Sequence, residues 1–115
     1  MKYVTYKGYR IPDPGIPVER ICKTTEGKWS EERALACAND EEADPKVLRY
    51  IYEKYGGNWE IMADLAENPK APDDIICKLI VHPNELVRIH AEAVEYERGL
   101  KCPRPPIPIW RRILW

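Results

Sequence analysis

Apolar side chains recur every three or four positions through the middle of the chain, a spacing that predicts short amphipathic helices. Leu48, Ile51 and Tyr55 belong to the clearest of these stripes. Asp44-Pro45 precedes the stripe as a cap and a first-turn proline, and Gly56-Gly57 follows it as a stop signal. The pattern therefore predicts one helix between these two boundaries.

The same reasoning predicts four further helices, so that helices occupy most of residues 30–99. Each follows a capping residue or a proline, and each carries an apolar side that we expect to face a common core. Their starts and apolar positions are Ser30 with Leu35, Ala36 and Ala38; Asn58 with Trp59, Met62, Leu65 and Ala66; Pro72 with Ile75, Ile76, Leu79 and Ile80; and Asn84 with Leu86, Val87, Ile89, Ala93 and Val94. The last helix is expected to end near Gly99.

Both ends of the chain differ from this helical middle. Residues 3–11 are rich in Tyr, Val, Thr and Ile, and Lys7-Gly8 suits a tight turn, which predicts a small β-hairpin. Three prolines within residues 12–17 exclude a helix there. Four prolines within residues 103–108 predict an extended, polyproline-like tail.

The helical middle also contains an internal repeat. A shift of 27 positions places Pro45 on Pro72 and Leu48 on Ile75; it also places Trp59 on Leu86, Met62 on Ile89 and Ala66 on Ala93. Repeats of this length are typical of helical solenoids, whose units bury their apolar faces on one another. The alternative is an irregular helical bundle whose helices have similar lengths. Two units are fewer than the three that usually give stability, so the hairpin and the tail are expected to cap the ends.

One stretch carries a more specific pattern. Ala66-Glu67-Asn68-Pro69 leads to a helix opened by Pro72, and a turn with Pro83 then precedes Val87-Arg88. This order resembles the leucine-rich repeat variant, a relative of the HEAT-like helical repeats, over about residues 38–98. The first unit, residues 38–62, keeps the skeleton but lacks Asn-Pro and Val-Arg. The resemblance implies stacked short helices and a binding role. It implies no cofactor here, because the cysteine-rich N-terminal segment that holds an iron–sulfur cluster in some members is missing.

We therefore predict a mostly α fold in one domain, as the length of 115 residues suggests. Residues 1–29 form the hairpin and turn segment, residues 30–99 a short, solenoid-like core of stacked repeats, and residues 100–115 a Pro-rich basic-aromatic tail. The largest contributions to the core are expected from Trp59, Met62, Ile75, Leu79, Leu86 and Ile89.

Composition and charge predict the temperature and the cell compartment to which the protein is adapted. The chain has no Gln, one Ser and 11 Pro, and 32% of its residues are charged, a trend of heat-adapted proteins. Residues 1–29 carry +3, residues 30–98 carry −8 and residues 99–115 carry +4, so an acidic middle lies between basic ends. No apolar run reaches the length of a membrane span and no signal-peptide pattern opens the chain. We expect a cytoplasmic protein that is not embedded in a membrane.

Four cysteines, Cys22, Cys37, Cys77 and Cys102, are spaced without any Cys-x-x-Cys pair, which argues against a zinc finger. Three interpretations remain open: buried free thiols, one or two disulfides, or a metal or cluster site. Disulfides fit a heat-adapted cytosol. A bridge from Cys102 to Cys77 or Cys37 would fasten the tail to the repeat.

The last residues form the most unusual stretch. Trp110, Arg111, Arg112, Ile113 and Trp115 combine aromatic rings with guanidinium groups, as interface hot spots do. The tail can fold back on its own core, reach another copy or another protein, or contact nucleic acid. The acidic middle weighs against the last use, because a nucleic-acid surface needs a continuous basic face.

No catalytic motif is recognised. His82 and His90 lack partners at metal-ligand spacing, and no HExxH, GxSxG or phosphate loop occurs. The acidic clusters Asp40-Glu41-Glu42 with Asp44, and Asp73-Asp74, are interpreted as helix-start residues that stabilise exposed N–H groups. We expect no enzyme, no metal and no cofactor.

These observations favour a non-catalytic protein–protein interaction or assembly module that contacts another protein or itself through the tail. A small heat-adapted chain of this kind also suits a viral or mobile-element protein. Two alternatives stay open: a nucleic-acid-associated factor that uses the basic ends, and a thiol or metal-binding protein.

Overall fold

The computed structural model describes residues 2–104 and shows a mostly helical fold with a small N-terminal hairpin. The hairpin pairs β1 (Tyr3–Tyr6) with β2 (Tyr9–Pro12) in antiparallel register, and a short 3₁₀ helix, η1 (Val18–Arg20), follows. The five α-helices are α1 (Glu31–Ala38), α2 (Pro45–Tyr55), α3 (Trp59–Glu67), α4 (Asp73–Leu79) and α5 (Glu85–Arg98). Sequence patterns predicted all of these elements except η1.

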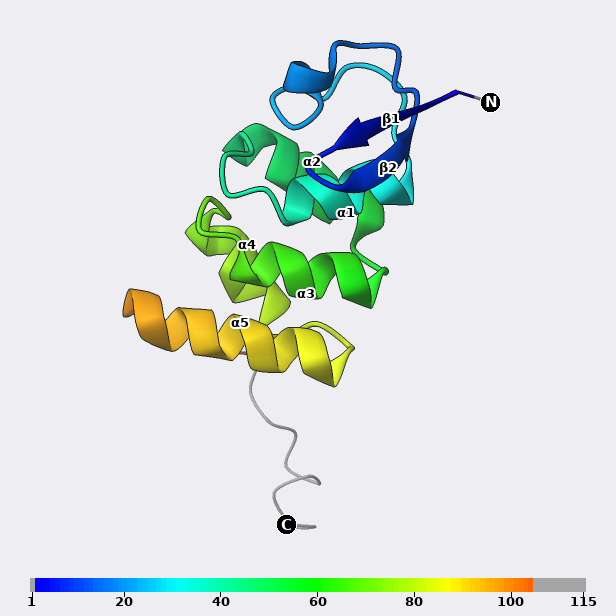
Figure 1. Cartoon of the computed structure of the whole chain (residues 1–115). Coiled ribbons are helices and arrows are strands. Elements are labelled where there is room, and N and C mark those ends of the chain that lie inside the picture. The colour runs from blue at the N-terminus through cyan, green and yellow to red at the C-terminus, as the bar shows by residue number, and fades with distance from the viewer. Residues whose placement is uncertain (1, 105–115) are drawn as a thin grey trace, which may run out of the picture.

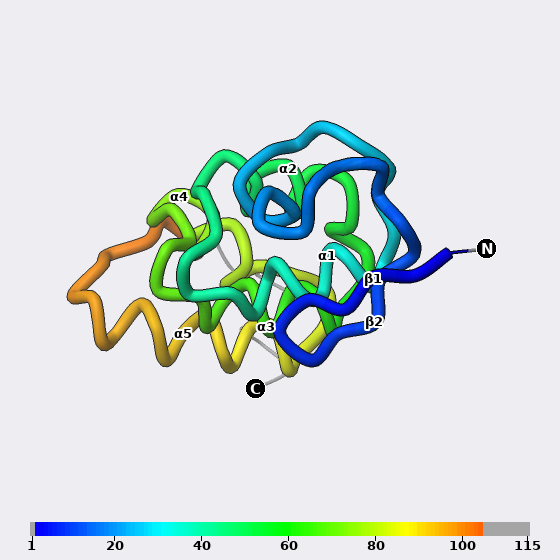
Figure 2. Tube along the Cα trace, turned by 45° about the horizontal axis from the view of Figure 1, so that its top comes forward, coloured from blue at the N-terminus to red at the C-terminus, as the bar shows by residue number. Residues whose placement is uncertain are grey.

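The helices are arranged with α3 at the centre (Figure 1). It packs between α1 and α5, while α2 contacts α1 and α3, and α4 contacts α3 and α5. The hairpin covers α1 at one end of the molecule, and α5 lies at the other end, as Figure 2 also shows. A β-hairpin therefore covers one end of the helical core, and an α-helix forms the other end.

Local sequence explains where the helices begin and end. Side-chain oxygens of Ser30, Asp44, Asn58 and Asn84 each accept a hydrogen bond from a first-turn N–H, and this confirms the four predicted caps. Gly99 ends α5 with φ +67°, a left-handed conformation that glycine adopts without steric cost.

The core joins residues from all five helices and from the N-terminal segment. Its largest fully buried apolar side chains are Ile11, Ile21, Val47, Leu48, Ile51, Ile61, Met62, Leu65, Ile75, Ile76 and Leu79. Val87 and Ala91 complete it from α5. The core placement of Met62, Ile75 and Leu79 is therefore confirmed.

The core placement of Trp59, Leu86 and Ile89 is wrong, since these side chains are 44%, 49% and 53% exposed. The shift of 27 residues accounts for Ile89, because it pairs this exposed residue with the buried Met62. Trp59 and Leu86, which the same shift pairs, lie in the first turns of α3 and α5 and are both exposed.

The cap Asn58 and the buried Ile61 and Leu65 of α3 correspond to Asn84, Val87 and Ala91 of α5 at a shift of 26. The caps and buried positions of α2 and α4 correspond at a shift of 28. One residue of misregister rotates a helical pattern by about 100°, which turns a buried face to solvent.

The four cysteines form two disulfides, Cys22–Cys37 and Cys77–Cys102, with Cα–Cα distances of 5.2 and 5.1 Å. Both distances lie in the usual range for a bridge. All four cysteines lie among the described residues and are bridged there, so the free-thiol interpretation is wrong. The first bridge ties the N-terminal segment to α1, and the second ties the start of the tail to α4.

Arg33 is a fully buried arginine on α1 that the sequence patterns did not single out. It donates five hydrogen bonds of 2.8–3.1 Å to the backbone carbonyls of Ile21, Thr24, Glu26 and Lys28, two of them to Ile21. The Trp29 ring lies 3.9 Å from its guanidinium carbon. Burial lowers the pKa of Arg33 to about 10, so the side chain stays charged at neutral pH. Arg33 thereby fixes the loop between η1 and α1.

Asp40 fastens the hairpin to the loop after α1. Its carboxylate accepts hydrogen bonds from the Tyr6 hydroxyl, from Lys7 Nζ at 2.8 Å and from the Glu42 N–H at 2.9 Å. Burial opposes the charge on Asp40, but these bonds outweigh it and hold the pKa of Asp40 below its usual value. The interpretation of Asp40 as a helix-start residue is therefore wrong, because it follows α1 and its side chain is buried; Asp44 does cap α2.

Candidate functional site

The predicted contact residues Trp110, Arg111, Arg112, Ile113 and Trp115 lie outside the described residues. What the structure places is the point where the tail begins. The Cys77–Cys102 bridge holds residue 102 against α4, and the Cys102 N–H donates to Glu95 Oε2 at 3.0 Å. Arg104 also pairs with Glu95, at 2.6 Å. The tail therefore starts from a fixed position beside α5.

A row of exposed apolar residues follows the outer side of α5. We name Leu86, Ile89, Ala93 and Tyr96 the α5 stripe. At about 100° per residue they fall on one side of the helix, opposite Val87 and Ala91, and they span about 15 Å along its axis. Leu86 and Ile89 are about half exposed and Tyr96 is 89% exposed. The stripe is an apolar surface that nothing in residues 2–104 covers.

Acidic residues border this stripe. Glu85 and Glu92 lie along one margin and Glu97 along the other, and all three are exposed. The basic residues of α5 are occupied elsewhere: Arg88 donates to the carbonyls of its preceding turn, and Arg98 donates to the loop between α3 and α4. The surface thus combines an apolar centre with a negative rim.

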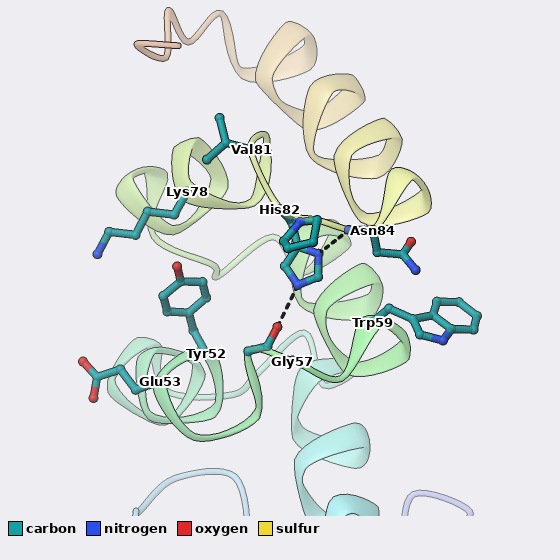
Figure 3. A pocket seen from close by; sticks show the side chains of 10 residues that line it. Tyr52, Glu53, Gly57, Trp59, Lys78, Val81, His82 and Asn84 are labelled. Atoms are coloured by element: carbon teal, nitrogen blue, oxygen red, sulfur yellow. Dashed lines mark hydrogen bonds between the residues drawn. The ribbon is translucent and has the colours of Figure 1, made fainter. Parts of the chain in front are cut away.

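A second candidate is an open hollow of about 720 Å³ between the loop that joins α2 to α3 and the loop that joins α4 to α5. Tyr52, Lys78 and His82 contribute its side chains, and Lys78 Nζ lies 5.6 Å from the centre of the Tyr52 ring (Figure 3). Trp59 lies at its edge and points away from Tyr52. The hollow is wide and open to solvent, and none of its ten lining residues is Ser, Thr or Cys.

Both ring nitrogens of His82 are engaged. Nε2 lies 2.7 Å from the Gly56 carbonyl oxygen, and Nδ1 accepts the Asn84 N–H at 3.0 Å. Since a carbonyl can only accept, Nε2 carries the proton and Nδ1 is the acceptor. His82 joins two loops and has no nitrogen left to act as a general base. His90 forms a surface pair with Glu67 at 2.5 Å.

Within residues 2–104, no group of three or more His, Cys, Asp and Glu side chains is arranged to hold a metal ion. The four cysteines are engaged in disulfides. The structure thus offers no thiolate ligands for the thiol or metal-binding alternative. No helix in this part of the chain has the length and apolar character needed to cross a membrane.

Comparison with known proteins adds no assignment: no family model, no curated protein and no solved structure matches the chain.

Sequence reasoning missed the α5 stripe because it assigned Leu86 and Ile89 to the core. The helix carries two apolar sides, one with Val87, Ala91 and Val94 and one with Leu86 and Ile89. A helix that is apolar on two sides indicates either deep burial or a face without a partner. A helical-wheel projection of residues 85–98 contains that signal.

Proposed function

We propose that this chain is a non-catalytic protein–protein interaction or assembly module, built as a short stack of helical repeats. The α5 stripe is the observation that carries the proposal. Contiguous apolar patches of this kind mark interaction sites on small soluble proteins, because leaving them in water costs free energy. The corresponding burial patterns of α2 with α4 and of α3 with α5 support the repeat, in line with the resemblance to the leucine-rich repeat variant.

The tail is proposed as the second half of the contact. Trp110 and Trp115 offer large apolar surfaces, and Arg111 and Arg112 offer charge-assisted hydrogen bonds. Side chains of these types carry most of the binding free energy in protein interfaces. A tail anchored at Cys102 and Arg104 delivers them from a fixed origin.

Affinity capture from the native host cell, followed by reconstitution with the purified captured protein, tests this function. We expect calorimetric binding that weakens at least tenfold in a Trp110→Ala/Trp115→Ala variant, because each buried aromatic hot spot is worth about 2 kcal/mol or more. The Trp59→Ala variant is the matched control, since Trp59 is also exposed but lies on α3. Equal binding by all three proteins would contradict a role for the tail.

The nucleic-acid alternative has one structural observation in its favour. Lys2, Arg10, Arg20 and Lys28 are exposed on the N-terminal segment, and Arg10 stacks 4.4 Å from the centre of the exposed Tyr3 ring. Titration with single- and double-stranded oligonucleotides in a salt series tests it. Phosphate contacts require an affinity that falls steeply with salt, and a flat response rejects the alternative.

We also propose that the protein acts in the cytoplasm of a heat-adapted organism, with a viral or mobile-element origin as the accompanying hypothesis. Two disulfides are compatible with such a cytosol, because intracellular proteins of hyperthermophiles are rich in them. A secretory route would provide the same oxidation. Fractionation of host cells with thiol trapping separates these settings, since only the first gives oxidised protein in the cytosolic fraction.

A further inference from the structure

We propose that the α5 stripe binds the C-terminal tail of a second copy of this chain. This inference rests on the proposed interaction function and names its partner. Three observations lead to it: the chemistry of the stripe, the place where the tail begins, and the length and composition of residues 105–115.

The chemistry of the two surfaces is complementary. The stripe presents Leu86, Ile89 and Tyr96 between exposed glutamates on both margins. Residues 107–115 present Ile, Trp and Leu side chains together with two arginines and no acidic residue. Apolar contacts would bury the stripe, while the arginines meet the negative rim and fix the register.

The position of the tail origin favours a neighbour over the chain's own stripe. Glu95, which holds Arg104 and the Cys102 N–H, lies about 140° around α5 from the centre of the stripe. The Pro105-Pro106-Ile107-Pro108 sequence favours a stiff, extended lead of about 3.1 Å per residue. Five residues of polyproline-like chain cover about 15 Å, so this sequence disfavours a tight bend around the chain's own α5.

The surface available is sufficient for a stable pair. Two copies that exchange tails reciprocally contribute four tryptophans, each able to bury about 150–250 Å². The isoleucine and leucine side chains of both tails add to this total, which brings the contact to the size class of specific protein interfaces, about 1,200 Å² or more. A reciprocal exchange also closes the assembly at two copies.

Sedimentation equilibrium of full-length proteins over a concentration series tests the inference. We expect the natural chain to dimerise. Leu86→Lys/Ile89→Lys removes the stripe and Trp110→Ala/Trp115→Ala removes the tail anchors, so each variant should dimerise at least about thirtyfold more weakly, the effect of one lost hot spot. Val18→Lys is the control, because it adds a charge at an exposed residue remote from α5 and should change nothing.

A mixture of the two variants gives the sharper result. The stripe variant keeps an intact tail and the tail variant keeps an intact stripe, so a pair of the two keeps one of the two reciprocal contacts. It should form a one-to-one complex that is tighter than the self-association of either variant and weaker than the dimer of the natural chain. Circular dichroism of each variant controls for folding.

Several results would overturn the inference. A natural chain that stays monomeric, a dimer that the stripe variant leaves unchanged, or a mixture that associates no more tightly than either variant alone would each do so. A monomer whose tryptophan emission changes in the stripe variant would show instead that the tail covers its own α5. Binding of a different protein through the tail by a monomeric chain would leave the proposed function standing while the second copy is rejected.

Discussion

The two ends of the helical core are finished in opposite ways. At the N-terminal end, the hairpin, the Cys22–Cys37 bridge and the buried side chains of Arg33 and Asp40 close the surface of α1. At the other end, the Cys77–Cys102 bridge ties the segment that follows α5 to α4, and the outer side of α5 stays apolar and exposed. Polar groups are hydrogen-bonded at the hairpin end, which we call the closed end, whereas apolar groups of α5 face water at the other end.

The largest expected effect contrasts two leucines. Leu79 is fully buried on α4, and Leu86 is half exposed on α5. Leu79→Ala should lower the free energy of unfolding by about 2–5 kcal/mol, because it removes buried methyl groups and leaves a cavity. Leu86→Ala should cost below about 0.5 kcal/mol in the monomer. Urea denaturation of dilute protein measures both, and equal losses would mean that Leu86 contributes to the core and that the α5 stripe is not a free surface.

Removal of the disulfides compares the ends directly. Cys22→Ala/Cys37→Ala opens a loop of 15 residues and Cys77→Ala/Cys102→Ala a loop of 25 residues. Each should cost about 3 kcal/mol, since a bridge mainly restricts the unfolded chain and the cost grows slowly with loop length. Denaturation midpoints provide the measurement. Only Cys77→Ala/Cys102→Ala should also alter self-association, because only the Cys77–Cys102 bridge fixes the position where the tail begins. An effect of Cys22→Ala/Cys37→Ala on dimerisation would contradict the difference between the two ends.

Arg33→Lys tests how much the buried arginine stabilises the end of the molecule that the hairpin covers. Lysine keeps the charge but cannot reproduce the planar donor fork, so carbonyl groups around Ile21 lose their partners. We expect a loss of about 2 kcal/mol in the free energy of unfolding. Arg20→Lys is the matched control, since Arg20 is exposed and should tolerate the change within about 0.5 kcal/mol. Equal tolerance at both positions would mean that the buried fork is dispensable.

The smallest effect concerns pH. The lowered pKa of Asp40 means that its contribution to stability is complete above the pKa of an unfolded aspartate, and is lost as pH falls through the lower native value. Asp40→Asn should cost about 1–2 kcal/mol at neutral pH, and this difference should shrink in acid. Thermal unfolding from neutral to strongly acidic pH measures it, with Asp13→Asn, at an exposed aspartate, as the control. A difference that is constant with pH would show that the charge of Asp40 contributes nothing.

Sequence predicted the elements well because their signals are local. The caps at Ser30, Asp44, Asn58 and Asn84 and the Lys7-Gly8 turn depend on residues a few positions apart, and the structure confirms them. Lys7 and Gly8 both adopt positive φ, +45° and +87°, as a two-residue hairpin turn requires.

Features that depend on distant partners could not be predicted in this way. Arg33 contacts carbonyls up to 12 residues away, and Asp40 meets Tyr6 and Lys7 across more than 30 positions. Whether Leu86 or Val87 faces the core depends on how α5 is rotated against α3. The loops and the packing of the helices set that rotation. A repeat length averaged over both pairs of helices does not give it.

The two disulfides divide the covalent structure into separate loops that do not overlap. Residues 38–76, which include α2 and α3, contain no cross-link to either side. A protease cut at the Gly56-Gly57 turn would therefore yield two fragments with no covalent link between them, each with its own closed ring. A cut at Glu26-Gly27, inside the first ring, would leave both fragments joined. The middle of the molecule is thus the stretch between the two rings where only peptide bonds join the two halves of the chain.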